Sequence, residues 1–106
     1  MRRKDSQKNA ESLLVDPQSA GPEGISAKTV LAIKLNELIE KRELSQIEVA
    51  SITGMTQPKV SQVRRYKLQN ISLERLMQAL VALDQRIEII VRPTHRTHIA
   101  GITVVA

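Results

Sequence analysis

The sequence has no cysteine, tryptophan or phenylalanine, and Tyr66 is its only aromatic residue. The lack of cysteine excludes disulfide bonds, thiol catalysis and cysteine-ligated zinc, and it suits a reducing cytoplasm. The lack of aromatic side chains argues against modules that stack nucleic-acid bases on aromatic platforms. No apolar run is long enough to cross a bilayer, and polar residues follow the basic start at Arg2, Arg3 and Lys4, unlike in a signal peptide. We therefore expect a soluble, cytoplasmic protein without a membrane partner.

Positive charge is concentrated in one part of the chain. The 16 Lys and Arg residues outnumber the 11 Asp and Glu residues, which gives a net charge of +5. Basic and acidic residues balance within residues 1–24, whereas residues 51–73 contain Lys59, Arg64, Arg65 and Lys67 and no carboxylate. A localised positive surface on a small domain is typical of proteins that bind a polyanion.

The 106 residues, 42% of them hydrophobic, are enough for one core and therefore for one domain. Residues 1–24 are polar and interrupted by prolines, so we expect a disordered or weakly ordered arm. Within it, the apolar cluster Leu13, Leu14 and Val15 is a candidate anchor for a partner protein. Residues 25–93 form the predicted folded domain, and residues 94–106 form a C-terminal tail.

Four helix-start signals of the same kind follow from residue 25. In each, a Ser or Thr stands directly after one apolar residue and four positions before another; these cap residues are Ser26, Ser45, Thr56 and Ser72. The hydroxyl can accept a hydrogen bond from an unpaired backbone N–H, and the two apolar residues can pack together as a hydrophobic staple. Glu48 completes a capping box with Ser45. The signals predict helices over residues 27–43, 46–53, 57–66 and 73–84.

After the last predicted helix, apolar residues recur at every second position. Ile87, Ile89 and Val91 lie on one side of this alternating pattern, which predicts an amphipathic strand over residues 86–92. A lone strand is not stable and needs a partner. We favour the same strand of a second subunit, because a two-fold axis supplies it, over residues 102–105 of the same chain. The three apolar residues are therefore the predicted dimerisation residues.

The two middle helices are separated by only three residues, as a helix-turn-helix requires. Ala50 is small where the second helix must pass close, and Gly54 can adopt the positive φ that the turn needs. Val60 and Val63 are spaced to point inward together. We predict a mainly α fold: a compact helix-turn-helix domain of four to five helices, with one C-terminal β-strand pairing across a dimer.

These motifs resemble a known family. The segments Gln46-Ile47-Glu48-Val49-Ala50, Gly54, Gln57-Pro58-Lys59-Val60-Ser61 and Ile71-Ser72-Leu73-Glu74-Arg75-Leu76 are similar to the Cro/CI-type (Xre) helix-turn-helix. The ending at residues 86–93 resembles the HigA-like antitoxins of type II toxin–antitoxin pairs. The resemblance covers about residues 27–93 and implies a homodimeric repressor that binds an inverted-repeat operator, neutralises a small RelE/HigB-type ribonuclease toxin and autoregulates its operon. Composition and spacing by themselves lead only to DNA binding.

The helix that starts at Gln57 is the predicted reading helix in the major groove of double-stranded DNA. Glutamine can pair with adenine, arginine with guanine, and proline can contact a thymine methyl group. The predicted base-reading residues are Gln57, Pro58, Ser61, Gln62 and Arg65. The predicted phosphate-binding residues are Gln46, Thr56, Lys59, Arg64 and Lys67, and the resemblance implies the same role for Gln46. The competing interpretation is an ordinary solvated polar face.

Other functions find less support in the sequence. Nothing resembles a nucleophile elbow, a glycine-rich phosphate loop or a pair of catalytic carboxylates, so we expect neither an enzyme nor a cofactor or small-molecule substrate. His95 and His98 lack nearby residues to complete a metal site. Two alternatives stay open: a free-standing Xre-type regulator without a toxin, and a protein-interaction module that does not bind DNA. For toxin neutralisation, the arm at residues 1–24 is favoured over the tail at residues 94–106.

Overall fold

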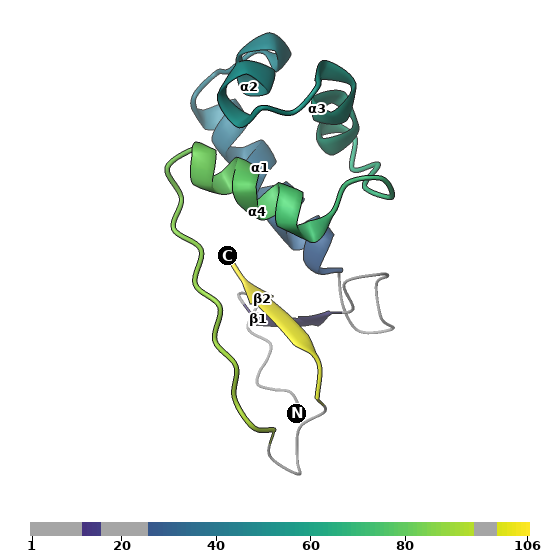
Figure 1. The fold of residues 1–106 in the computed structure, drawn as a ribbon, viewed down its shortest axis with the longest axis vertical. Coiled ribbons are helices and arrows are strands. Elements are labelled where there is room, and N and C mark those ends of the chain that lie inside the picture. The colour runs from purple at the N-terminus through teal and green to yellow at the C-terminus, as the bar shows by residue number, and fades with distance from the viewer. Residues whose placement is uncertain (1–11, 16–25, 95–99) are drawn as a thin grey trace.

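A computed structural model describes residues 12–15, 26–94 and 100–106. Its elements in chain order are β1 (Ser12–Val15), α1 (Ala27–Lys41), α2 (Gln46–Thr53), α3 (Gln57–Arg64), α4 (Leu73–Ala82) and β2 (Ile102–Val105). The four helices form one body, and the two strands lie beside the end of this body that is remote from α2 (Figure 1). The prediction of a mainly helical domain is confirmed, and each helix begins at the predicted residue.

The helix starts agree because each cap is satisfied locally. The hydroxyls of Ser26, Ser45 and Ser72 accept the backbone N–H three residues on, at 3.0–3.1 Å, and Thr56 does the same at 3.3 Å. At α2 the Glu48 carboxylate also accepts the Ser45 N–H at 2.8 Å, which completes the predicted capping box. Such bonds satisfy N–H groups that the first helical turn leaves unpaired.

Three helices end two residues earlier than predicted. The residue two positions after α1, α3 and α4 has a left-handed backbone: Glu43 (φ 56°), Tyr66 (φ 60°) and Asp84 (φ 68°). The next N–H then bonds back to a carbonyl five residues earlier, as in the 2.8 Å bond from Lys67 N–H to Gln62 O. This closure ends a helix, and it is usually marked in a sequence by glycine. None of the three positions is glycine, so the sequence carried no stop signal there.

The core lies where α1 packs against α3 and α4, and α2 covers it by packing against the same two helices. Its most deeply buried large side chains come from every helix, from the loop before α4 and from the C-cap of α4: Leu35, Val49, Val60, Val63, Ile71, Leu76 and Leu83. The α2–α3 unit is thereby mounted on α1 and α4, and it sits at one end of the molecule (Figure 1).

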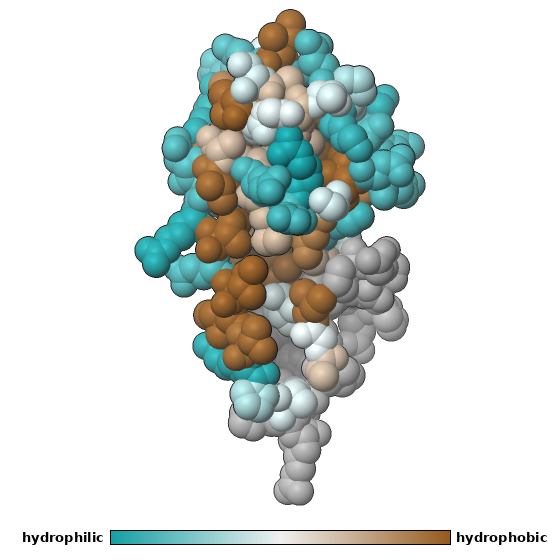
Figure 2. All heavy atoms as spheres, viewed as in Figure 1, coloured by the Kyte–Doolittle hydropathy of each residue, from teal (hydrophilic) through white to brown (hydrophobic). Residues whose placement is uncertain are grey.

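The segment after α4 differs from the prediction. Residues 86–92 are extended but form no strand in the described single chain, because no neighbouring backbone pairs with them (Figure 1). Ile87 is half-buried against the core, whereas Ile89 and Val91 are 75% and 90% exposed. Figure 2 shows hydrophobic side chains gathered down this side of the molecule. The intersubunit pairing of this segment stays a prediction.

The tail pairs with the arm instead of with residues 86–92. β1 and β2 form an antiparallel two-stranded sheet in which Leu13 lies opposite Val104 and Val15 opposite Ile102. Val104 is half-buried and packs against the helical core. The cluster Leu13–Val15, expected on a weakly ordered arm, therefore has strand backbone, and the rest of the arm lies outside the described residues.

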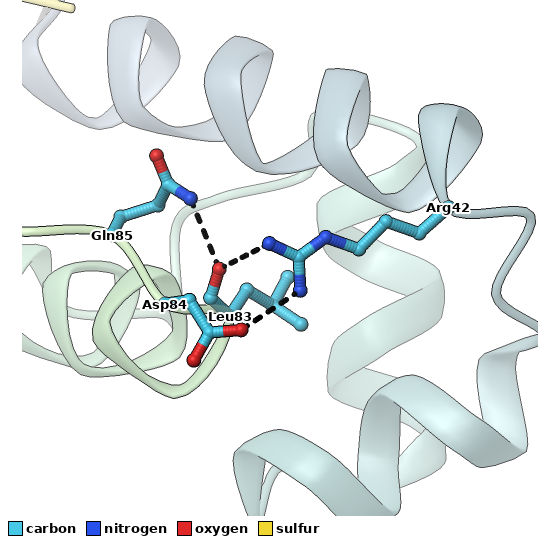
Figure 3. A network of polar contacts seen from close by, with 4 residues as sticks. All are labelled: Arg42, Leu83, Asp84 and Gln85. Carbon is cyan, nitrogen blue, oxygen red and sulfur yellow. Dashed lines mark hydrogen bonds and ion pairs between the residues drawn. The ribbon is translucent and has the colours of Figure 1, made fainter.

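A polar network fixes where the extended segment leaves the helical body. The Arg42 guanidinium, just after α1, donates to Leu83 O at 2.8 Å and to the Asp84 carboxylate at 3.3 Å (Figure 3). The Gln85 side chain donates to the same Leu83 carbonyl at 3.0 Å. Because these bonds join the C-terminal ends of α1 and α4, the chain enters residues 86–94 in a defined direction.

Candidate nucleic-acid interface

The turn between α2 and α3 is held by backbone geometry, by the Thr53 hydroxyl and by the Arg75 guanidinium. Gly54 has φ +78°, and its N–H bonds to Ala50 O at 2.9 Å. The Thr53 hydroxyl donates to Val49 O at 2.7 Å and accepts the Met55 N–H at 3.2 Å. The Arg75 guanidinium caps the end of α2 by donating to Thr53 O at 3.1 Å. These contacts give the short, fixed connection of a helix-turn-helix.

The outer face of α3 carries most of the predicted base-reading residues. Val60 and Val63 are each 1% exposed and turn one side of the helix into the core. Gln57, Pro58 and Arg65 are exposed, and Ser61 is half-buried. Pro58 lies in the first turn, where its missing N–H removes no intrahelical bond. The helix therefore offers amide, hydroxyl and guanidinium groups to a partner on its outer side.

Gln62 is arranged differently from the other four predicted base-reading residues. Its side chain is half-buried, and its amide oxygen is buried with no hydrogen-bond partner among the residues that the structure describes. A buried acceptor without a partner is unfavourable. For this oxygen to reach a base edge, the side chain must turn outward.

Two of the four cations in the carboxylate-free segment are bound within the chain. The Lys59 ammonium donates to Asn70 O at 2.6 Å, which ties α3 to the loop before α4. The Arg64 guanidinium donates to Asn36 Oδ1 at 2.7 Å and to the Glu40 carboxylate at 3.3 Å. Arg65 and Lys67 are exposed. The sequence showed where the positive charge is concentrated but not which cations serve the fold.

The remaining predicted phosphate contacts lie at helix N-termini. Gln46 is the first residue of α2, Thr56 caps α3, and both are exposed. The first-turn N–H groups of a helix and the positive end of its dipole attract anions. Gln46 and Thr56 are thus placed to present donors to a phosphate backbone.

Asn36 is a functional candidate that the sequence reasoning missed. It lies on α1, is 4% exposed, and donates from Nδ2 to Val63 O in α3 at 3.0 Å. The available signal was a polar side chain in the buried stripe of α1, next to Leu35 and three residues before Ile39. Such a group needs buried hydrogen-bond partners.

The described residues contain neither a metal-binding cluster nor a membrane-spanning helix. In the described ranges no group of three or more His, Cys, Asp or Glu side chains is placed to hold a metal ion. His95 and His98 lie outside those ranges. No described helix combines the length and the apolar character needed to span a membrane.

Comparisons with known proteins agree with this geometry. A family profile for a helix-turn-helix domain matches residues 13–92. A solved structure described as an XRE-family transcriptional regulator is 48% identical, with a TM-score of 0.70 over 76% of this chain and 91% of the other. No functionally curated protein matches the chain. The paired short helices, the fixed turn and these similarities together show that the chain belongs to the XRE-type family of helix-turn-helix transcriptional regulators.

Proposed function

We propose that this protein is a sequence-specific repressor that binds double-stranded DNA as a homodimer in the cytoplasm, with α3 in the major groove. The observation that carries the proposal is the outer face of α3. A short helix, set at the end of the molecule by a fixed turn, exposes Gln57, Pro58 and Arg65 in a segment without carboxylates. Side chains of these types read base edges.

In this proposal the residues that contact DNA fall into two groups, one that reads bases and one that holds phosphates. Gln57, Pro58, Ser61, Gln62 and Arg65 read bases, with Gln62 turning outward on binding. Gln46, Thr56 and Lys67 hold phosphates. Lys59 and Arg64, which the sequence also pointed to as phosphate contacts, already have acceptors in the chain, so their binding to DNA would compete with those bonds.

The homodimer uses the extended segment 86–92. The exposure of Ile89 and Val91 supports this assignment, because a row of exposed aliphatic side chains on an extended backbone is suited to pairing with an identical strand. A two-fold axis through these strands would present two copies of α3 to half-sites about 34 Å apart. Bound across a promoter, the dimer would block transcription.

The test is selection of duplexes from a randomised pool, followed by titration of affinity against salt. Arg65→Ala should relax base preference at one position in each half-site. Lys67→Ala should weaken all duplexes alike and lower the log–log salt slope by about one. Lys34→Ala is the matched control, since Lys34 lies two residues from Asn36 on α1 and so on the side turned away from α3. A wild-type chain that binds no duplex at low salt refutes the proposal and supports the protein-interaction module.

We further propose that the protein is an antitoxin that neutralises a RelE/HigB-type ribonuclease toxin through its arm, at Leu13, Leu14 and Val15. Support comes from the HigA-like ending at residues 86–93 and from the apolar arm cluster. Co-expression with the product of an adjacent gene of that class should relieve its toxicity, and Leu13→Thr, a substitution in the arm cluster that keeps a strand-forming residue in β1, should weaken this relief. If no such gene adjoins this one, the protein is a free-standing regulator.

A further inference from the structure

We infer that Asn36 of α1 is the positioning residue that orients α3, an inference that rests on the DNA-binding function proposed above. Among the described residues, Asn36 and Thr53 are the buried polar ones. Thr53 serves the turn after α2. An amide buried at 4% exposure is unfavourable unless both of its ends are paired, and both ends of Asn36 are paired to α3.

The two bonds reach consecutive residues at the C-terminal end of α3. Asn36 Nδ2 donates to Val63 O at 3.0 Å, and Asn36 Oδ1 accepts from Arg64 Nη1 at 2.7 Å. Glu40, one turn further along α1, accepts from Arg64 Nη2 at 3.3 Å and is largely exposed. The Asn36 side chain therefore holds the last turn of α3 at two points, the main-chain carbonyl of Val63 and the side chain of Arg64.

Apolar packing by itself defines the orientation of α3 poorly. The helix has eight residues, of which Val60 and Val63 are buried. Apolar contacts have no preferred direction, whereas hydrogen bonds weaken steeply as their angle departs from linear. The Asn36 bonds therefore resist rotation and sliding of α3 against α1. Base contacts are equally directional, so the same bonds set where Gln57 and Arg65 meet the groove.

This arrangement gives Arg64 a role different from that of Arg65 and Lys67. Its side chain is 30% exposed and its guanidinium is bonded to two side chains of α1. We assign it to the support of α3 rather than to a phosphate. The two possible roles of Arg64, supporting α3 and binding a phosphate, predict different salt dependences. Loss of a phosphate contact lowers the log–log slope of affinity against salt concentration by about one, whereas loss of a supporting contact does not.

The experiment compares Asn36→Leu and Arg64→Met with Glu40→Gln as the matched control, which keeps an acceptor for Arg64. The probes are the duplex that the wild type selects from a randomised pool and a scrambled duplex of the same composition. For the first two variants the ratio of selected to scrambled affinity should fall about tenfold, as expected when a base contact is lost. Affinity for the scrambled duplex and its salt slope should be unchanged. The double variant should lose no more than the larger single effect.

Hydrogen exchange provides a readout that needs no DNA. In folded Asn36→Leu or Arg64→Met, amides of α3 should exchange faster relative to those of α4, while in Glu40→Gln they should not. An unchanged affinity ratio with unchanged α3 exchange overturns the inference, as does an Arg64→Met variant whose salt slope falls by about one. If Asn36→Leu does not fold, Arg64→Met decides. If the wild type selects no duplex, the proposed function fails and the exchange measurement still decides whether Asn36 holds α3.

Discussion

Replacing Gly54 with alanine tests whether the turn between α2 and α3 depends on a left-handed backbone. Gly54 has φ +78°, and a Cβ atom added there would lie 3.4 Å from Arg75 Nη2, which is an ordinary van der Waals contact. Steric conflict with neighbouring atoms therefore contributes little to the loss of stability in Gly54→Ala, and most of that loss comes from the left-handed backbone conformation. A non-glycine residue in the left-handed region costs about 1–2 kcal/mol. Alanine also restricts the unfolded chain, which offsets about 0.4–1 kcal/mol of that cost.

The net expectation is a loss of about 1 kcal/mol in the free energy of unfolding, or about 4–8 °C in Tm for a domain of this size. Circular dichroism melts at a fixed protein concentration would measure it. Gly54→Asn should lose less, because asparagine tolerates this conformation. Glu43→Gly is the converse test: Glu43 is exposed with φ 56°, so glycine there should raise Tm. If Gly54→Ala melts at or above the wild-type temperature, the reasoning about this turn is refuted.

Three further predictions concern the helix starts, the core and the dimer. Ser45→Ala removes the cap of α2 and should cost about 1 kcal/mol in urea unfolding; no loss would mean that the capping box is dispensable. Leu76→Ala, at a fully buried position, should cost about 2–5 kcal/mol, whereas Val81→Ala, at 55% exposure, should stay within about 0.5 kcal/mol. Ile89→Lys should yield monomers in sedimentation and weaken operator binding, and a monomeric wild type would contradict the assigned dimer.

The sequence predicted the helices well because their start signals are local. A cap hydroxyl and the backbone N–H that donates to it lie three residues apart, as for Ser45 and Glu48, so neighbouring residues in the sequence carry the whole interaction. The helix ends were less predictable. Glu43, Tyr66 and Asp84 adopt a conformation that glycine normally marks, and here the surrounding fold imposes it.

The parts of the site that the sequence missed depend on distant contacts. The bonds from Asn36 reach Val63 and Arg64, which only the packing of α1 against α3 brings near. Lys59 and Arg64 look like free cations in a carboxylate-free segment, yet their acceptors come from Asn70 and α1. Charge counted along the sequence therefore predicts a location for the interface, but it overstates the number of cations that have no acceptor within the described chain.

The β1–β2 pairing also changes how truncations of this protein should be interpreted. Because Ser12 lies opposite Val105, the two ends of the polypeptide share one set of backbone hydrogen bonds. Deleting either end leaves the other with an unpaired edge, so a phenotype seen with both deletions would reflect a single joint structure and not two separate functional regions. Point substitutions that preserve the ladder, such as Thr103→Val in β2, are the cleaner way to assign a role to one terminus.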